Sequence, residues 1–233
     1  MNTLVMIPAL GCDAGLYEKI AARLGDFVSL RTIVADRGSL AACASQVLDA
    51  VDGDFIILGT SFGGRVALET ALAAPERVKG LAVIGAGPGA VADPAAGLRR
   101  SRRLRGGEFE QVAAEMGAII VHLPGPNGPD TRAAFIAMCR KQGAELMARQ
   151  SDALAQRGDL WPRLDAITCP ALMLWGHFDQ FSPAADGLKF ATAVPHGRYV
   201  ELADCGHFPP LEAPDESVAA IADWLIDNGL TSG

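Results

Sequence analysis

Short apolar runs alternate with amphipathic stretches along most of this 233-residue sequence. Runs rich in β-branched and aliphatic residues predict strands near residues 3–7, 28–34, 54–58, 80–85, 171–175 and 197–202. The amphipathic stretches predict helices near residues 13–24, 39–50, 62–74, 184–193 and 215–227. Apolar strands separated by helices are typical of a parallel sheet covered on both faces. The alternation therefore predicts an α/β fold with about six mostly parallel strands.

One long segment, residues 87–165, interrupts the alternation. It shows no convincing strand, and its helical pieces are separated by proline and glycine. We therefore expect a core of residues 1–86 and 166–233, with a helical insertion after the fourth strand. Apolar residues at helical spacing are more often packed inside such an insertion than exposed to a pocket. Those in this segment are Phe109, Met116, Ile119, Ile120, Phe135, Met138 and Met147.

A single serine lies where the third strand gives way to a helix, in the stretch LGTSFGGR at residues 58–65. The pattern Gly59-Thr60-Ser61-Phe62-Gly63 is that of a nucleophile elbow, a sharp turn that projects the serine hydroxyl. Glycines around the serine relieve the crowding of such a turn. A phosphate-binding loop would require a Gly-Lys-Ser/Thr ending, which is absent here. We interpret Ser61 as a catalytic nucleophile.

A serine nucleophile needs a base and an acid that orients the base. His207 follows the last predicted strand in DCGHFPPLEAP, and it is the candidate base. Asp179 follows the fifth strand, and the chain order Ser–Asp–His is that of hydrolases with this elbow. Asp204 is the alternative acid, although a turn or surface role suits it better. His177 could line a pocket, but it is more simply read as a surface residue, as are His122 and His196.

Two backbone amides should stabilise the oxyanion that forms during acyl transfer. The amide of Phe62 is one candidate, because it follows the nucleophile. The second should come from the loop after the first strand, PALGCDAGLY, if strands one and three are neighbours. Leu10 is the candidate in that loop. A plain strand-to-helix turn is the alternative interpretation of the same loop.

Composition limits the partners that we expect. The net charge is −7 and the sequence pI is about 5.1, which disfavours nucleic-acid binding. Five scattered cysteines without a CxxC pair indicate reduced thiols rather than a zinc or redox site. No stretch has the length of a membrane span, and the first residues do not resemble a signal peptide. We expect a cytoplasmic protein that binds neither membrane nor metal.

Three stretches in this order resemble the α/β-hydrolase superfamily, and in particular its small bacterial serine hydrolases. They are GTSFGGRVALETALAAPERVKGLAVIGAG, CPALMLWGHFDQFSP and ELADCGHFPPLEAPDESVAAIADWL. The resemblance covers nearly the whole chain. It implies the α/β-hydrolase fold, a catalytic triad and an oxyanion hole beneath a helical cap, here residues 87–165. The chain begins on the oxyanion-loop strand, so we expect about six strands rather than the usual eight.

The same resemblance sets the expected activity. Pro8-Ala9 replaces a frequent His-Gly, but ALGCD otherwise resembles the family's oxyanion loop, which assigns the second donor to Leu10. We expect a serine esterase, or a lactone- or thioester-cleaving relative, that uses an acyl-enzyme on Ser61 and no cofactor. Carbon–carbon bond hydrolysis and a slow-turnover small-molecule receptor are the alternatives. A serine at this position argues against haloalkane dehalogenases and epoxide hydrolases, which attack through a carboxylate.

An arginine cluster in the insertion bears on the substrate. The stretch RRSRRLR places five arginines within residues 99–105 of an otherwise acidic protein. A solvated helix face is the simpler interpretation of such a charge run. Attraction of an anionic ester, lactone or acyl-thioester is the functional one. The sequence leaves the oligomeric state open.

Overall fold

A single parallel sheet organises the computed structural model, which describes residues 2–231. Its six strands lie in the order β2-β1-β3-β4-β5-β6, and every neighbouring pair is parallel. The strands are β1 (Thr3–Ile7), β2 (Ser29–Thr32), β3 (Phe55–Thr60), β4 (Val78–Ile84), β5 (Ala171–Gly176) and β6 (Gly197–Leu202). This confirms the predicted six-stranded parallel sheet. Because β1 and β3 are neighbours, the loop after β1 lies beside the turn after β3.

Burial follows each strand's place in the sheet. The internal strands β3 and β5 are buried along their whole length. The edge strands β2 and β6 are largely half-exposed or exposed. This difference explains why FIILGT and ALMLWG are continuously apolar, whereas SLRT and GRYVEL carry charged residues. The core therefore lies along the middle of the sheet.

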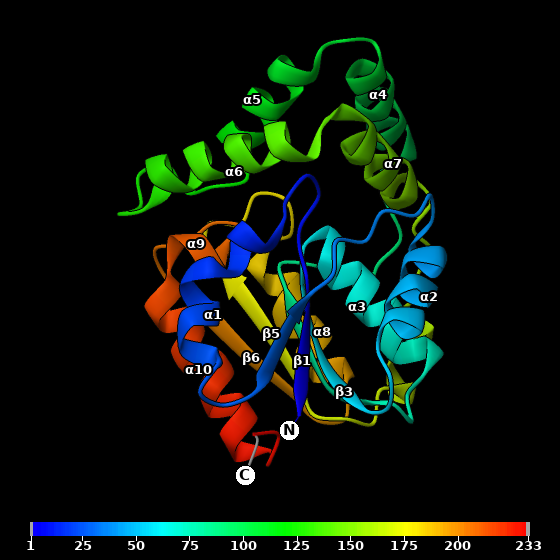
Figure 1. The fold of residues 1–233 in the computed structure, drawn as a ribbon, viewed down its shortest axis with the longest axis vertical. Coiled ribbons are helices and arrows are strands. Elements are labelled where there is room, and N and C mark those ends of the chain that lie inside the picture. Colours follow the sequence, from blue (N-terminus) through cyan, green and yellow to red (C-terminus); the bar gives the residue numbers. More distant parts are fainter. Residues whose placement is uncertain (1, 232–233) are drawn as a thin grey trace.

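Helices cover both sides of the sheet, as predicted. Figure 1 shows α1 and α10 on one side and α2 and α3 on the other. Within each pair the helices pack against each other, and α3 also packs on β1, β3 and β4. The helices of this part are α1 (Glu18–Leu24), α2 (Leu40–Ala50), α3 (Phe62–Ala73), α8 (Ala184–Ala193), α9 (Pro209–Glu212) and α10 (Pro214–Asp227).

Four helices of the segment 87–165 gather above the ends of the strands (Figure 1). They are α4 (Pro94–Arg105), α5 (Phe109–Ile119), α6 (Gly128–Gln142) and α7 (Ala144–Ala155). Within this group α4 packs along α7, and α5 packs against α6. A 3-10 helix, η2 (Trp161–Ala166), leads back to the sheet and contacts both α3 and α8. No helix among residues 2–231 is long and apolar enough to cross a membrane.

Two helical elements around the sheet differ from the prediction. The helix expected at residues 13–24 begins as a 3-10 turn, η1 (Ala14–Tyr17), and continues as α1. Asp13 caps this turn by accepting a hydrogen bond of 2.9 Å from the Gly15 amide. The four-residue helix α9 was not predicted, because one turn that begins with Pro209-Pro210 shows no periodicity. It begins two residues after His207.

Candidate active site

Ser61 lies on a strained turn between β3 and α3. Its φ is 55° and its ψ is −114°, and it is the one residue other than glycine with a positive φ in residues 2–231. Such a conformation costs a serine about 1–3 kcal/mol and persists where the surroundings enforce it. Here a Cβ on Gly59 would lie 2.0 Å from the Gly63 carbonyl oxygen, and one on Gly63 would lie 1.9 Å from that of Ile7. Gly59 and Gly63 therefore cannot carry a side chain, because other backbone atoms lie too close to where a Cβ would be.

Asp179 and His207 form a buried pair. Asp179 Oδ2 lies 2.7 Å from His207 Nδ1, and the two side chains are 0% and 4% exposed. The other carboxylate oxygen accepts hydrogen bonds of 2.9 Å from the amides of Phe181 and Ser182, which orients the group. With Nδ1–H donated to the carboxylate, His207 Nε2 carries the lone pair that can accept a proton.

The surroundings of His207 hold its ring in place. Gly85, with a φ of 61°, packs against the pair, and a Cβ there would come within 3.0 Å of His207 Nδ1 and 3.1 Å of Asp179 Oδ2. The Phe181 and Phe208 rings lie with their centroids 5.2 Å and 5.7 Å from that of His207. A substitution at Gly85 would thus disturb the pair directly.

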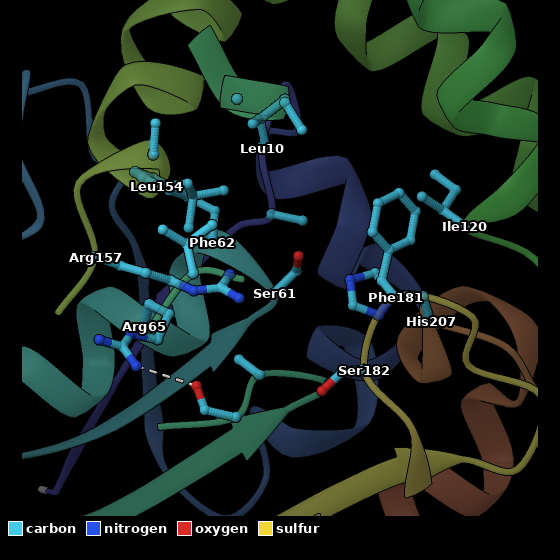
Figure 2. Close-up of a pocket in the computed structure, with 18 of the residues that line it drawn as sticks. Leu10, Ser61, Phe62, Arg65, Ile120, Leu154, Arg157, Phe181, Ser182 and His207 are labelled. Atoms are coloured by element: carbon cyan, nitrogen blue, oxygen red, sulfur yellow. Dashed lines mark hydrogen bonds between the residues drawn. The ribbon is translucent and has the colours of Figure 1, made fainter. Parts of the chain in front are cut away.

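Ser61 and His207 line the same cavity of about 420 Å³. Figure 2 shows the Ser61 hydroxyl and the His207 ring facing its interior, from the turn between β3 and α3 and from the loop after β6. The hydrogen bonds among the described residues include none between Ser61 Oγ and the imidazole. Such bonds are often long before substrate binds and shorten in the complex. The structure thus brings Ser61 and His207 to one cavity, and Asp179 is hydrogen-bonded to the far side of the His207 ring.

The loop after β1 supplies the other predicted donor. Leu10 lines the cavity together with Phe62, and the hydrogen bonds described for residues 2–231 include none donated by either amide. The next amide, that of Gly11, donates instead to Gln150 Oε1 at 2.8 Å. Gln150 belongs to α7 and is 1% exposed, and its Nε2 donates to the Ala35 carbonyl at 2.8 Å. One side chain of the insertion therefore secures the loop that carries Leu10.

Residues of the insertion form part of the cavity wall. Met116, Ile120 and Phe135 line it, so the expectation that these three are interior packing alone is wrong. Met116 lies on α5, Ile120 directly after that helix and Phe135 on α6, and this part of the insertion sits above the strand ends (Figure 1). The Ile120 carbonyl also accepts a hydrogen bond of 2.9 Å from the His207 amide. Sequence spacing identified the apolar face but could not show which part of it meets the core.

Glu212 anchors the loop that carries His207. It is 3% exposed, and its Oε1 accepts a hydrogen bond of 2.8 Å from the Phe208 amide. Its Oε2 accepts hydrogen bonds of 2.8 Å from the amides of Gly206 and His122. Both neighbours of His207 are thus tied to one carboxylate. This role was missed, because LEAP at residues 211–214 reads as an ordinary helix start.

Arg65 was also missed, although the sequence held a signal for it. It lies one helical turn after Ser61 in FGGRVALETALA and is 1% exposed, because the residues around it are small or apolar. It donates hydrogen bonds of 3.0–3.2 Å to the carbonyls of Gly87, Gly89 and Gly158. Burial lowers its pKa to about 10. Arg65 thus ties both ends of the insertion to the nucleophile helix, and it also lines the cavity.

The remaining candidates lie elsewhere. His177 is exposed and pairs with Glu201 at 2.6 Å, and it is not among the cavity-lining residues. Asp204 is exposed, far less buried than Asp179, which agrees with the preference for Asp179. In the part of the chain that the structure describes, no three His, Cys, Asp or Glu side chains gather as metal ligands would. All five cysteines are free thiols.

Known proteins resemble this chain along most of its length. A 2-hydroxy-6-oxononadienedioate/2-hydroxy-6-oxononatrienedioate hydrolase of Dechloromonas aromatica is 30% identical over 77% of the chain and 65% of that protein. The chain therefore spans just under two thirds of the first such relatives. A pimeloyl-[acyl-carrier protein] methyl ester esterase of Nitrosomonas europaea is 26% identical over 93% of the chain and 92% of that protein.

A solved structure shows the same fold. That of a thermophilic esterase from Thermogutta terrifontis superposes with a TM-score of 0.89, at 22% identity, over 98% of this chain and 90% of that one. The model of the alpha/beta hydrolase family matches residues 4–221, which include the strained serine turn and the Asp–His pair. The chain therefore belongs to the α/β hydrolase family.

Proposed function

We propose that the protein hydrolyses a carboxylic ester, or a related lactone or thioester, through an acyl-enzyme on Ser61. The buried Asp179–His207 pair at the cavity that Ser61 faces is the observation that carries the proposal. A neutral imidazole held in one tautomer by a carboxylate is the base that a serine nucleophile needs. We also propose that residues 87–165 form a cap over the active site. The small-molecule acyl substrate would occupy the cavity beneath this cap.

The proposed reaction has two halves. Ser61 Oγ attacks the acyl carbonyl as His207 Nε2 takes its proton. The amides of Phe62 and Leu10 donate to the oxyanion. Collapse of the tetrahedral intermediate expels the alcohol, which takes the proton from His207, and leaves the acyl group on Ser61. Water, deprotonated by His207, then attacks the acyl-enzyme; as the second tetrahedral intermediate collapses, Ser61 Oγ takes the proton back from His207 and the acid is released. Asp179 stabilises the imidazolium in both halves.

Covalent labelling tests this proposal. A fluorophosphonate should label the wild-type protein at Ser61 and leave Ser61→Ala unlabelled. Ser101→Ala is a matched control, because Ser101 is buried in α4 outside the cavity and should leave labelling unchanged. A panel of acyl esters and lactones of varied length then defines turnover. Labelling retained in Ser61→Ala, or no turnover of any ester, lactone or thioester, would overturn the proposal.

Carbon–carbon bond hydrolysis is a second candidate, favoured by the 30% identical relative, a 2-hydroxy-6-oxononadienedioate/2-hydroxy-6-oxononatrienedioate hydrolase. The same serine, histidine and aspartate would serve it, but the leaving group would be carbon and would need a proton delivered to it. Loss of the visible absorption of a 2-hydroxy-6-oxo-dienoate, measured beside ester turnover, separates the two. Faster cleavage of the dienoate, abolished by Ser61→Ala, would favour this candidate.

The cellular setting extends the proposal. Free thiols at all five cysteines agree with a reducing compartment, and we propose the cytoplasm. The net charge of −7 supports a small molecule rather than nucleic acid as the partner. Fractionation of the native host with an antibody to the protein tests the compartment.

A further inference from the structure

The arginine cluster of α4 divides into two groups in the structure. Arg99, Arg103 and Arg105 pair with acidic side chains at 2.7–3.1 Å on the outer surface of the insertion. Arg102 is exposed as well. Arg100 differs, because it is half-buried and lines the cavity that Ser61 faces. The interpretation as a solvated face therefore holds for the rest of the cluster and is wrong for Arg100.

Arg157 lines the same cavity as Arg100 and lies just after the end of α7. Figure 2 shows the Arg157 side chain extending into the cavity that Ser61 faces. Its Nε is buried and has no hydrogen-bond partner. Arg100 Nε donates to Ser151 Oγ at 2.8 Å, which leaves both terminal nitrogens of that guanidinium free of the described hydrogen bonds. Two planar donor groups are thus presented to one cavity.

The neighbouring carboxylates do not neutralise this pair. Asp93 lines the cavity, but it caps α4 and pairs with Arg99 at 2.9 Å. Asp186 also lines the cavity and forms no ion pair within the described residues. None of the ion pairs described for residues 2–231 includes Arg100 or Arg157. The closest carboxylate to Arg65, that of Glu69, lies 3.7 Å away on the same helix.

Like charges in a buried setting are costly when unpaired. Burial, and then the charge of Arg157, lower the pKa of Arg100, while burial alone lowers that of Arg157. A guanidinium remains charged at neutral pH even so. A bound anion would relieve both the desolvation and the mutual repulsion. Carboxylates suit this arrangement, because a guanidinium binds them through two parallel hydrogen bonds.

We propose that Arg100 and Arg157 bind a carboxylate of the substrate, separate from the acyl carbonyl that Ser61 attacks. This rests on the proposed hydrolytic function and specifies its substrate class: a small ester or lactone that carries a second, anionic end. A cavity of about 420 Å³ holds a molecule of that size. The cap thus supplies charge recognition, and the core supplies the chemistry.

Paired substrates test the proposal. One series comprises methyl hydrogen esters of the three- to seven-carbon dicarboxylic acids, each compared with its neutral dimethyl ester. A second places the carboxylate on the alcohol side, as butyryl esters of ω-hydroxy acids compared with their methyl esters. Wild type should prefer the anionic member of at least one pair. Arg157→Gln and Arg100→Gln should each reduce the anionic-to-neutral ratio of kcat/KM by about 10- to 100-fold.

Matched variants separate recognition from general damage. Arg102→Gln removes a charge from the exposed side of the same helix and should leave the ratio unchanged. Arg157→Lys keeps the charge but not the planar fork, so it should recover part of the preference. Added salt should lower kcat/KM for the anionic esters more than for the neutral ones.

A binding measurement keeps this inference distinct from the proposed chemistry. Titration calorimetry with the free dicarboxylates from malonate to pimelate should detect one site in Ser61→Ala, weakened by Arg157→Gln and not by Arg102→Gln. If no ester turns over but a dicarboxylate binds in this way, the hydrolytic proposal fails and the anion site stands. If every pair shows equal kcat/KM for its two members, or the arginine variants slow both equally, the anion site is overturned.

Discussion

The side chain of Gln150 on α7 accepts a hydrogen bond of 2.8 Å from the amide of Gly11, so that a helix of the insertion supports the loop after β1. The same side chain donates to Ala35 after β2, at 2.8 Å. Removing it would leave a buried amide and a buried carbonyl without partners. The predicted donor Leu10 precedes Gly11 directly, so the orientation of its amide depends on this contact.

Gln150→Leu should therefore lose both stability and activity. We expect the free energy of unfolding to fall by about 2 kcal/mol, because each unpaired buried group costs about 1–3 kcal/mol and the leucine recovers part of that. The kcat for any turned-over ester should fall as well. Chemical denaturation and steady-state kinetics measure the two effects. Gln156→Leu, at the exposed end of the same helix, should change neither. Equal stability of the two variants would contradict the role of Gln150.

Asp179→Asn should abolish most of the activity while keeping the fold. The amide matches the carboxylate in shape but cannot hold the same imidazole tautomer or stabilise its cation, and in other triads this costs about ten-thousandfold in kcat. Asp204→Asn is the control, since Asp204 is exposed and close in sequence to His207. Comparable losses in both variants, measured by ester turnover at neutral pH, would argue against the Asp179–His207 pair.

Glu212→Gln should weaken both the fold and the placement of His207. The carboxylate accepts three backbone hydrogen bonds, and an amide would turn an NH₂ group toward at least one of those donors. We expect a loss of about 1–3 kcal/mol in the free energy of unfolding, with a lower kcat and little change in KM. Glu216→Gln, on the exposed side of α10, provides the comparison. If Glu212→Gln is destabilised but its kcat equals that of the wild type, Glu212 stabilises the fold without positioning His207.

The contact between Asp13 and Lys141 should make stability depend on pH. Burial raises the pKa of Asp13, but hydrogen bonds from Lys141 and the Gly15 amide outweigh it and hold the pKa below its ordinary value of 3.8. The stabilisation is therefore complete above that ordinary value and is lost as the pH falls through the lower, folded-state pKa. Since Lys141 is 74% exposed, we expect about 0.5–1 kcal/mol.

Denaturation at several pH values checks this dependence. The difference in unfolding free energy between wild type and Asp13→Asn should be present at pH 6 and should shrink toward pH 3. Asp26→Asn, at an exposed position, should show no such trend. If the difference in unfolding free energy stays constant across this pH range, the charge of Asp13 contributes nothing to stability.

Strand prediction succeeded where the sequence pattern is strongest. The bounds of β1 and β6 are those predicted, and the internal strands differ by at most two residues at an end. The edge strand β2 was predicted too long, at residues 28–34, because Val28 and Ile33 continue the apolar run beyond the paired residues Ser29–Thr32. Local composition cannot show where pairing with a neighbouring strand stops.

The proposed catalytic side chains were identifiable because each follows a strand and belongs to a recognisable motif. Gln150, Glu212 and Arg157 were not, since Gln150 and Arg157 lie in the insertion and Glu212 lies in a one-turn helix, and none of them belongs to a recognisable motif. Gln150 lies 139 residues from the amide that it binds. Tertiary contacts of this kind become visible when the helices of the insertion are placed against the strand ends.

The hydrogen bonds that join the insertion to the loops around Leu10 and His207 have a consequence for protein engineering. Exchanging these helices for those of a relative, in order to alter substrate range, would also displace the backbone acceptor at Ile120 and remove the donor and acceptor of Gln150. A chimaera would have to retain these three atoms or lose rate along with selectivity. The helical insertion of this protein is not an independent module.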